Sequence, residues 1–496
     1  MSIQFSGLAS GIDTESMIKE LMKAERMKVE NVEKEKTKLE WKQEIWQDMN
    51  NKLYDFYTNQ LFDLKSKGTF LQKNVTSSNE SVATVTGDVD AVEGSHSLNV
   101  TQVAKGSFLT SDALGDDLNG EEIALSTTAE ELIDFGGLTE VNLAVKTEST
   151  ETESEIAITK NDTLGDIIKK LKEADNDLNI NYDSNFNRMF LSTKSTGNDK
   201  QIELTGNEDL INALGFGTNN IGSNGEDANI EYNGTVLTSS SNEVSVNGLN
   251  IKLNSEGETN ITIAQDVEST YESIKDFVLK YNELIMDING KIDADSAREY
   301  QPLTNEEKEA MSENDIKLWE EKIKNSLLRR DNILSGLVTS MRNTLTGSSG
   351  VDTSDMDYQY LSQLGIVTGD YAEKGILHIE GDKDDSLYSA NNNKLKEAIK
   401  DNPEGVAEFF NAIGDKLDKT FSNQMKSTKL SSALTFYNDK HMNEKVLDYE
   451  EKILDLEERM IVVEDRYYRQ FTAMEKAMQQ ANTTSDWLTQ QLGGMQ

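Results

Sequence analysis

The sequence predicts an α+β multidomain protein with terminal coiled-coil helices and a helical-bundle stem into which β-rich head domains are inserted. Three observations support this fold class. Apolar residues recur at helical, seven-residue intervals near both ends of the chain. Between about residues 74 and 265, short alternating runs are punctuated by Gly, Asn, Asp and Ser, which is typical of strands and turns. The 496 residues include only two prolines, Pro302 and Pro403, which suits a chain rich in long helices.

The composition excludes several classes of protein. Lys and Arg number 49 against 89 Asp and Glu, so the formal charge is −40, which disfavours nucleic acid and anionic membrane surfaces as partners. The absence of cysteine excludes disulfides, thiolate metal sites and a Cys nucleophile, and it fits a protein that ends up outside the cell. We find no stretch of 18 apolar residues, so no membrane insertion is expected, and no cleavable signal peptide at the start of the sequence. Export, if it occurs, therefore needs a route without cleavage.

The first helix is expected to begin at Asp13 or Thr14, since either side chain can cap the first turn, and to end near Gly68. Its apolar positions include Ile18 and Met22. Those that follow at seven-residue spacing are Val32, Leu39, Trp46 and Leu53. Charged residues interrupt this seam in the 34–38 region.

The far end of the chain carries a more regular seam, in steps of three and four residues. Its members are Val446, Tyr449, Ile453, Leu456, Met460, Val463, Tyr467, Phe471, Met474 and Met478. One interpretation is a helix of an ordinary bundle. The length of the seam favours the alternative, in which the helix pairs with another chain or with the other end of its own chain.

The middle of the chain is predicted to form two small β-rich domains. The dipeptides Asn233-Gly234 and Asn247-Gly248 lie between alternating runs and predict two-residue hairpins, because both residues accept positive φ. One amphipathic helix is expected around Leu164–Leu171.

Helices resume near Asp266. The sequence Thr304-x-x-Glu307 predicts a capping box, and Asn402-Pro403 predicts an N-cap followed by the first residue of a helix. Together these patterns predict leg helices at 1–42 and 447–496, a stem at 43–73 and 266–446, a discontinuous β-rich head domain at 74–128 and 223–265, and an inserted variable α+β head domain at 129–222.

We find no catalytic constellation, and we expect neither an enzyme nor a cofactor. The three histidines, His96, His378 and His441, are far apart in sequence, and no nucleotide-binding or metal-binding motif is present. The cluster at Asp382, Asp384 and Asp385 lacks the rest of a calcium loop, so a solvated loop is the simpler interpretation. The two carboxylates of a glycosidase are brought together only by the fold, so the sequence does not exclude such a pair. However, no aromatic cluster that could bind sugar is apparent in the β-rich region.

Several motifs resemble one family. The N-terminal motif Phe5-Ser-Gly-Leu-Ala-Ser-Gly-Ile-Asp13 resembles that of the flagellar hook-associated protein 2 family, which caps the bacterial flagellar filament. Further segments that resemble this family are Leu98–Lys105, Leu364–Gly369, Lys374–Leu377, Asn402–Val406 and Arg466–Lys476. These segments span both termini and the stem, and the resemblance is least clear between about residues 130 and 222.

The resemblance implies a homo-oligomeric ring on the distal tip of the filament, outside the cell, which retains exported flagellin and promotes its folding and insertion. The terminal helices are then legs, and the seam residues from Ile18 to Trp46 and from Val446 to Met474 make contacts within the oligomer or with the filament. Export through the flagellar apparatus, with a cytoplasmic export chaperone, and contact with the hook–filament junction proteins are implied as well. The alternative function is a tip-exposed adhesin whose head domains bind host mucin or surface glycans.

Overall fold

The computed structural model describes residues 13–148, 154–217, 220–346 and 355–493. The chain forms two compact units, of which the second is inserted in sequence between the two parts of the first. The first unit consists of Met1–Phe70 and Glu268–Gln496, and the second of Leu71–Val267. The N-terminal motif falls outside the described residues up to Ile12. The finer domain boundaries given above stay predictions.

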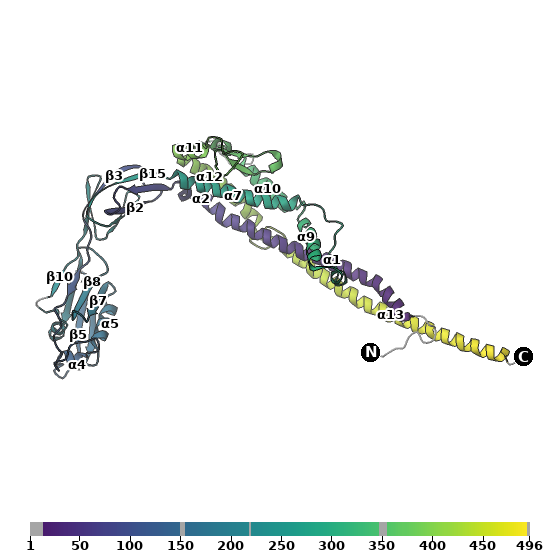
Figure 1. Cartoon of the computed structure of the whole chain (residues 1–496), viewed down its shortest axis with the longest axis horizontal. Helices are drawn as coiled ribbons and strands as arrows, with labels where there is room; N and C mark the ends of the chain where they lie inside the picture. Colours follow the sequence, from purple (N-terminus) through teal and green to yellow (C-terminus); the bar gives the residue numbers. More distant parts are fainter. Residues whose placement is uncertain (1–12, 149–153, 218–219, 347–354, 494–496) are drawn as a thin grey trace. The chain divides into compact units, whose positions relative to one another are not determined.

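The first unit is mainly helical. It contains the two long helices α1 (Thr14–Asp55) and α13 (Asp439–Gly493), which lie side by side (Figure 1). Its other helical elements are η1 (Phe56–Gln60), α2 (Leu61–Lys65), α3 (Lys67–Phe70), α7 (Val267–Ile292), α8 (Asn305–Glu309), α9 (Glu313–Ser326), α10 (Asn332–Leu345), η2 (Leu361–Leu364), η3 (Tyr371–Glu373), α11 (Lys394–Asp401) and α12 (Pro403–Gln424). The short strands β16 (Ile366–Thr368) and β17 (Leu377–Ile379) pair antiparallel between them.

Helix α1 begins where the sequence predicts, because the backbone N–H of Ser16 donates a hydrogen bond of 3.0 Å to the carboxylate of Asp13. The helix predicted to continue to near Gly68 is interrupted by the π-helical turn η1 and by extended backbone at Ser66. Spacing explains the π turn. Phe56 and Leu61 are both buried although they are five residues apart, and one extra residue per turn brings them onto the same face.

Aromatic side chains form the core of the helical unit. The ring of Phe56 lies 6.0 Å from that of Phe277 on α7 and 5.9 Å from that of Phe421 on α12, measured between centroids. Phe70 stacks on Phe410 of α12 at 5.5 Å. Such rings bury large apolar areas and gain further from their mutual orientation. The short helical segments that follow α1 are therefore anchored in a packed core.

The predicted helix starts are confirmed in this unit. Thr304 and Glu307 form the capping box of α8, and the Asn402 side chain accepts a hydrogen bond from Gly405 N–H with Pro403 at the first position of α12.

Two antiparallel sheets of the second unit are built from strands near the beginning and the end of its sequence, and they share one core. One sheet has the order β1 (Lys73–Ser77), β15 (Gly257–Gln265), β3 (Gly94–Gln102), β11 (Ala228–Tyr232) and β12 (Thr235–Ser239). The other has the order β13 (Glu243–Val246), β14 (Leu249–Leu253) and β2 (Ala83–Gly87). Alternate residues of β14 are buried, as expected for strands with one face toward a core.

Both predicted hairpins are confirmed. Asn233 and Gly234 have φ of 51° and 79° between β11 and β12, and Asn247 and Gly248 have φ of 53° and 76° between β13 and β14. Positive φ at both central residues is the type I′ geometry that matches strand twist.

A second core lies within the same unit, formed by residues between Leu114 and Phe216. One of its sheets has the order β10 (Ile221–Ser223), β4 (Phe108–Thr110), β8 (Arg188–Thr193) and β7 (Leu178–Asp183). The other has the order β6 (Ser154–Thr159), β5 (Glu140–Glu148) and β9 (Lys200–Gly206). Its helices are α4 (Ala129–Leu132), α5 (Leu164–Ala174) and α6 (Glu208–Ala213). Helix α5 is the predicted amphipathic helix, capped by Thr163. The fold class is thus confirmed: a helical unit with terminal coiled-coil helices carries an inserted β-rich unit.

Candidate functional site: the paired terminal helices

Helices α1 and α13 pack antiparallel. The ammonium group of Lys36 lies 3.0 Å from the Glu450 carboxylate, and the side-chain amide of Gln43 donates a hydrogen bond of 2.7 Å to Asn443. Residue numbers therefore rise along one helix as they fall along the other. Past the first turn of α1, α13 continues alone among the described residues (Figure 1).

The predicted seam of α1 faces α13 and the rest of the helical unit. Ile18, Val32 and Trp46 are buried, with 3%, 8% and 2% of their surface exposed, whereas Met22 and Leu39 are half-buried. Trp46 stacks on Tyr437, which lies just before α13, with ring centroids 5.4 Å apart. The indole therefore holds the chain that leads into α13 against α1.

A second column, made of polar residues, begins in the charged region of α1 and runs along the helix interface. Lys36, Gln43 and Asn50 are seven residues apart, and each reaches the segment that contains α13. Lys36 also lies 3.1 Å from Glu40, and its hydrogen bonds to Glu450 and then Glu40 raise the pKa of its ammonium group. Polar partners at apolar-type positions fix register, because a shifted pairing would leave them unsatisfied.

The predicted seam of α13 lies on the α1 side of the helix. Val446, Ile453, Leu456, Met460, Val463, Tyr467 and Phe471 are all half-buried. Met474, farther along, is 38% exposed. The seam is only partly covered, so its proposed role in contacts between subunits or with the filament stays a prediction.

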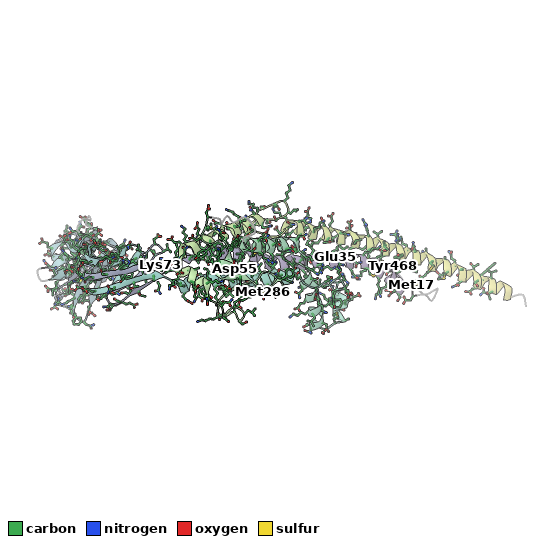
Figure 2. The ribbon with its side chains drawn as sticks, turned by 90° about the horizontal axis from the view of Figure 1, so that it is seen from above. Met17, Glu35, Asp55, Lys73, Met286 and Tyr468 are labelled. Atoms are coloured by element: carbon green, nitrogen blue, oxygen red, sulfur yellow. The ribbon has the colours of Figure 1, made fainter. Side chains whose placement is uncertain are left out.

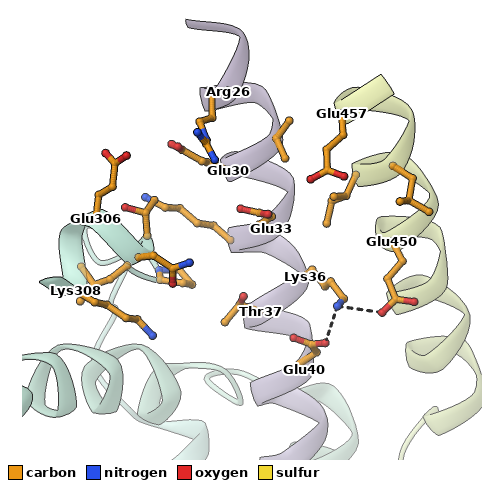
Figure 3. Close-up of a pocket in the computed structure, with 18 of the residues that line it drawn as sticks. Arg26, Glu30, Glu33, Lys36, Thr37, Glu40, Glu306, Lys308, Glu450 and Glu457 are labelled. Atoms are coloured by element: carbon orange, nitrogen blue, oxygen red, sulfur yellow. Dashed lines mark ion pairs between the residues drawn. The ribbon is translucent and has the colours of Figure 1, made fainter. Parts of the chain in front are cut away.

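A groove of about 730 Å³ runs between α1, α13 and the segment from Pro302 to Lys308 (Figure 3). Carboxylates from all three sides line it, and Figure 3 shows Glu30, Glu33 and Glu457 among them, together with the ion pairs that Lys36 forms. No cation in the described chain lies within ion-pair distance of these three carboxylates. The groove is open, acidic and partly apolar, which suits a protein or peptide contact better than a small-molecule reaction.

Sequence reasoning missed a second stripe on α13. Its members are Leu447, Leu454, Ile461 and Tyr468, which are 64%, 62%, 64% and 37% exposed. They are seven residues apart and so occupy one line along the helix, next to the column of Val446, Ile453 and Met460. The seven-residue spacing is visible in the sequence, but the more regular neighbouring seam conceals it. Figure 2 shows Tyr468 at the level of Met17, which is 46% exposed at the beginning of α1.

The three histidines lie apart from one another. His96 contacts Tyr232 in the β-rich unit, and His441 is exposed. His378 lies between two carboxylates, at 2.7 Å from Glu373 and 2.5 Å from Asp385. Its partial burial lowers the pKa, but the hydrogen bonds to both carboxylates outweigh this effect, so the net pKa is raised.

The acidic cluster after β17 differs from the solvated loop that was expected. Asp382 is 8% exposed, and it pairs at 2.8 Å with Lys275 of α7, which also contacts Asp384. Asp382 therefore forms an internal ion pair between the loop and the helix, whereas the side chain of Asp384 is 81% exposed. Over the described ranges, no group of three or more His, Asp or Glu side chains is placed to hold a metal, and no helix is long and apolar enough to cross a membrane.

The architecture defines a class of protein. A crystal structure of the D1-D2-D3 domains of the flagellar cap protein FliD from Escherichia coli is similar, with a TM-score of 0.53 and 20% identity over 77% of this chain and 97% of that one. This chain therefore shares the fold of those D1-D2-D3 domains.

Sequence comparison then gives the family. The model of the flagellar hook-associated protein 2 C-terminus matches residues 225–483, and that of the N-terminus matches residues 10–107. Flagellar hook-associated protein 2 of Halalkalibacterium halodurans is 26% identical over 97% of this chain and 98% of its own length, and that of Escherichia coli K12 is 24% identical over 99% and 98%. The chain belongs to the flagellar hook-associated protein 2 family, and it is a flagellar filament cap protein.

Proposed function

We propose that this protein forms a homo-oligomeric ring on the distal tip of the growing filament, outside the cell. There it retains exported flagellin beneath the ring and promotes its folding and insertion. In this proposal the paired helices α1 and α13 are legs that contact neighbouring subunits and the filament. The protein reaches the tip through the flagellar export apparatus, with the help of a cytoplasmic chaperone, and its other contacts are with the hook–filament junction proteins.

The observation that carries the proposal is the exposed apolar surface of α13. Four large side chains repeat every seven residues on a face that α1 leaves uncovered. Each fully buried Leu or Ile gains roughly 1.5–3 kcal/mol over the exposed state. A regular exposed stripe of this kind is the usual mark of a helix that acquires another helical partner.

Electron microscopy of the purified protein tests the proposal directly. We expect rings in isolation and density at filament tips when the protein is added to filaments. Deletion of residues 1–40 or 447–496 is expected to leave the β-rich unit folded and to abolish both. A truncated protein that still caps filaments contradicts the proposed role of the legs.

A second function, adhesion, has one supporting observation. Phe108, Phe190 and Ile221 share the outer face of the sheet β10-β4-β8-β7, since Thr110 pairs with both Phe190 and Ile221. They are 44%, 40% and 64% exposed. Aromatic side chains that are far apart in sequence thus meet on one open face. The full-length protein with Phe190→Ser should bind mucin-coated surfaces less than the unchanged protein, and equal binding argues against adhesion through this face.

A further inference from the structure

Helix α13 has charges arranged in two separate columns beside its exposed apolar stripe. The acidic column consists of Glu451, Glu458 and Asp465, and the basic column of Lys452, Arg459 and Arg466. Members of each column are seven residues apart, so each column follows one side of the helix. Neighbours such as Glu458 and Arg459 are consecutive residues, which point to different sides of a helix.

These charges are largely unpaired within the subunit. All six side chains are exposed. Within the described part of the chain, they make two ion pairs with other residues of α13. Arg459 pairs with Asp455 at 3.7 Å, with side chains 75% and 65% exposed, and Asp465 pairs with Arg469 at 3.0 Å, with side chains 67% and 81% exposed. An exposed pair of this kind contributes little to stability. The two columns are therefore available to a partner.

Both the acidic and the basic side of α13 carry exposed apolar groups as well as charge. The acidic column borders the stripe of Leu454 and Ile461. On the basic side, Val462 is 68% exposed and lies three and four residues from Arg459 and Arg466, hence on the same face. Each side therefore combines an apolar centre with charge of one sign.

We propose that the partner is a second copy of this chain, whose α13 lies parallel to the first and packs its basic side against the acidic side. With no shift along the axis, Glu451 faces Lys452 of the partner subunit, Glu458 faces Arg459 of the partner subunit, and Asp465 faces Arg466 of the partner subunit. One residue corresponds to about 1.5 Å along a helix, so all three pairs are level together. Ile461 then meets Val462 of the partner subunit.

This contact is heterologous. A symmetric contact between two acidic sides would place like charges together, which disfavours a closed dimer. A contact between unlike sides leaves one free side on each subunit and propagates into a ring or an arc. The inference rests on the proposed ring and adds to it the surface, direction and register of the contact between legs.

Charge-swap variants of the full chain test the contact by sedimentation velocity. The variant E451K/E458K/D465K and the variant K452E/R459E/R466E should each self-associate at least about tenfold more weakly than the unchanged protein, because each has two sides of the same sign. An equimolar mixture of the two should recover self-association. A single chain with all six substitutions should also recover it, at unchanged net charge, which makes it the matched control for folding.

Cysteine pairs test the register, because the chain contains no other cysteine. Oxidation of E458C/R459C should give a ladder of covalent oligomers, whereas oxidation of E458C alone should give no covalent oligomers. Covalent dimers of E458C alone indicate a symmetric contact and overturn the inference. If the unchanged protein forms rings and both charge variants form the same rings, the inference is wrong and the proposed function stands. Absence of any self-association of the unchanged protein overturns both.

Discussion

Replacement of Trp46 by Ala is expected to destabilise the helical unit strongly. The indole is 2% exposed, and it stacks on Tyr437 at 5.4 Å with the ring planes 11° apart. Truncation of a buried Trp to Ala costs about 3–5 kcal/mol through lost burial and the cavity left behind. The lost stacking is part of this cost. Because Tyr437 leads into α13, the loss should also loosen the first turns of that helix.

The assay is denaturant unfolding followed by tryptophan fluorescence. All four tryptophans, Trp41, Trp46, Trp319 and Trp487, belong to the helical unit, so the signal reports that unit alone. Trp487→Ala is the matched control, since this side chain is 57% exposed on α13 and should change stability by less than about 0.5 kcal/mol. Hydrogen exchange of residues 71–267 should not change in either variant. Equal effects of the two substitutions would refute the assignment of Trp46 as the anchor between α1 and α13.

Three further predictions concern single side chains. Lys275→Met leaves the buried carboxylate of Asp382 without its cation and should cost roughly 3–5 kcal/mol, whereas Lys275→Met combined with Asp382→Leu should recover part of the loss in the same unfolding assay. His378 has a raised pKa in the folded state, so its stabilising contribution is complete below the unfolded pKa of 6.5 and is lost as the pH rises through the folded pKa. The difference in unfolding free energy between the unchanged protein and His378→Gln should therefore shrink from acidic to alkaline pH, and a constant difference contradicts the ion pairs. Gly248→Val should destabilise the β-rich unit by more than 1 kcal/mol, about the cost of a left-handed conformation, since φ is +76° and a Cβ would lie 2.8 Å from the backbone of Ala91. Circular dichroism of strand signals measures this loss, and Gly234→Val, where no atom lies within 4 Å of the added Cβ, separates strain from crowding.

Features of the fold that depend only on residues close together in the sequence could be predicted from it. The cap at Asp13, the hairpin at Asn247-Gly248 and the capping box at Thr304 all occur where expected. In each case the side chain or backbone preference acts within a few residues, so no knowledge of the rest of the chain is needed. The interruption of α1 at Phe56 was not predicted, because its cause is the packing of that ring against α7 and α12.

The sequence by itself determined that α13 is a long helix with a seven-residue repeat, and the motifs at both ends indicated the family. Only the tertiary structure decided which apolar column of α13 lies against α1 and which remains open. The columns that contain Ile453 and Leu454 have the same period, and periodicity alone does not distinguish them. The choice depends on where α1 lies, and the ion pair between Lys36 and Glu450 helps to set that register, with partners separated by most of the length of the chain.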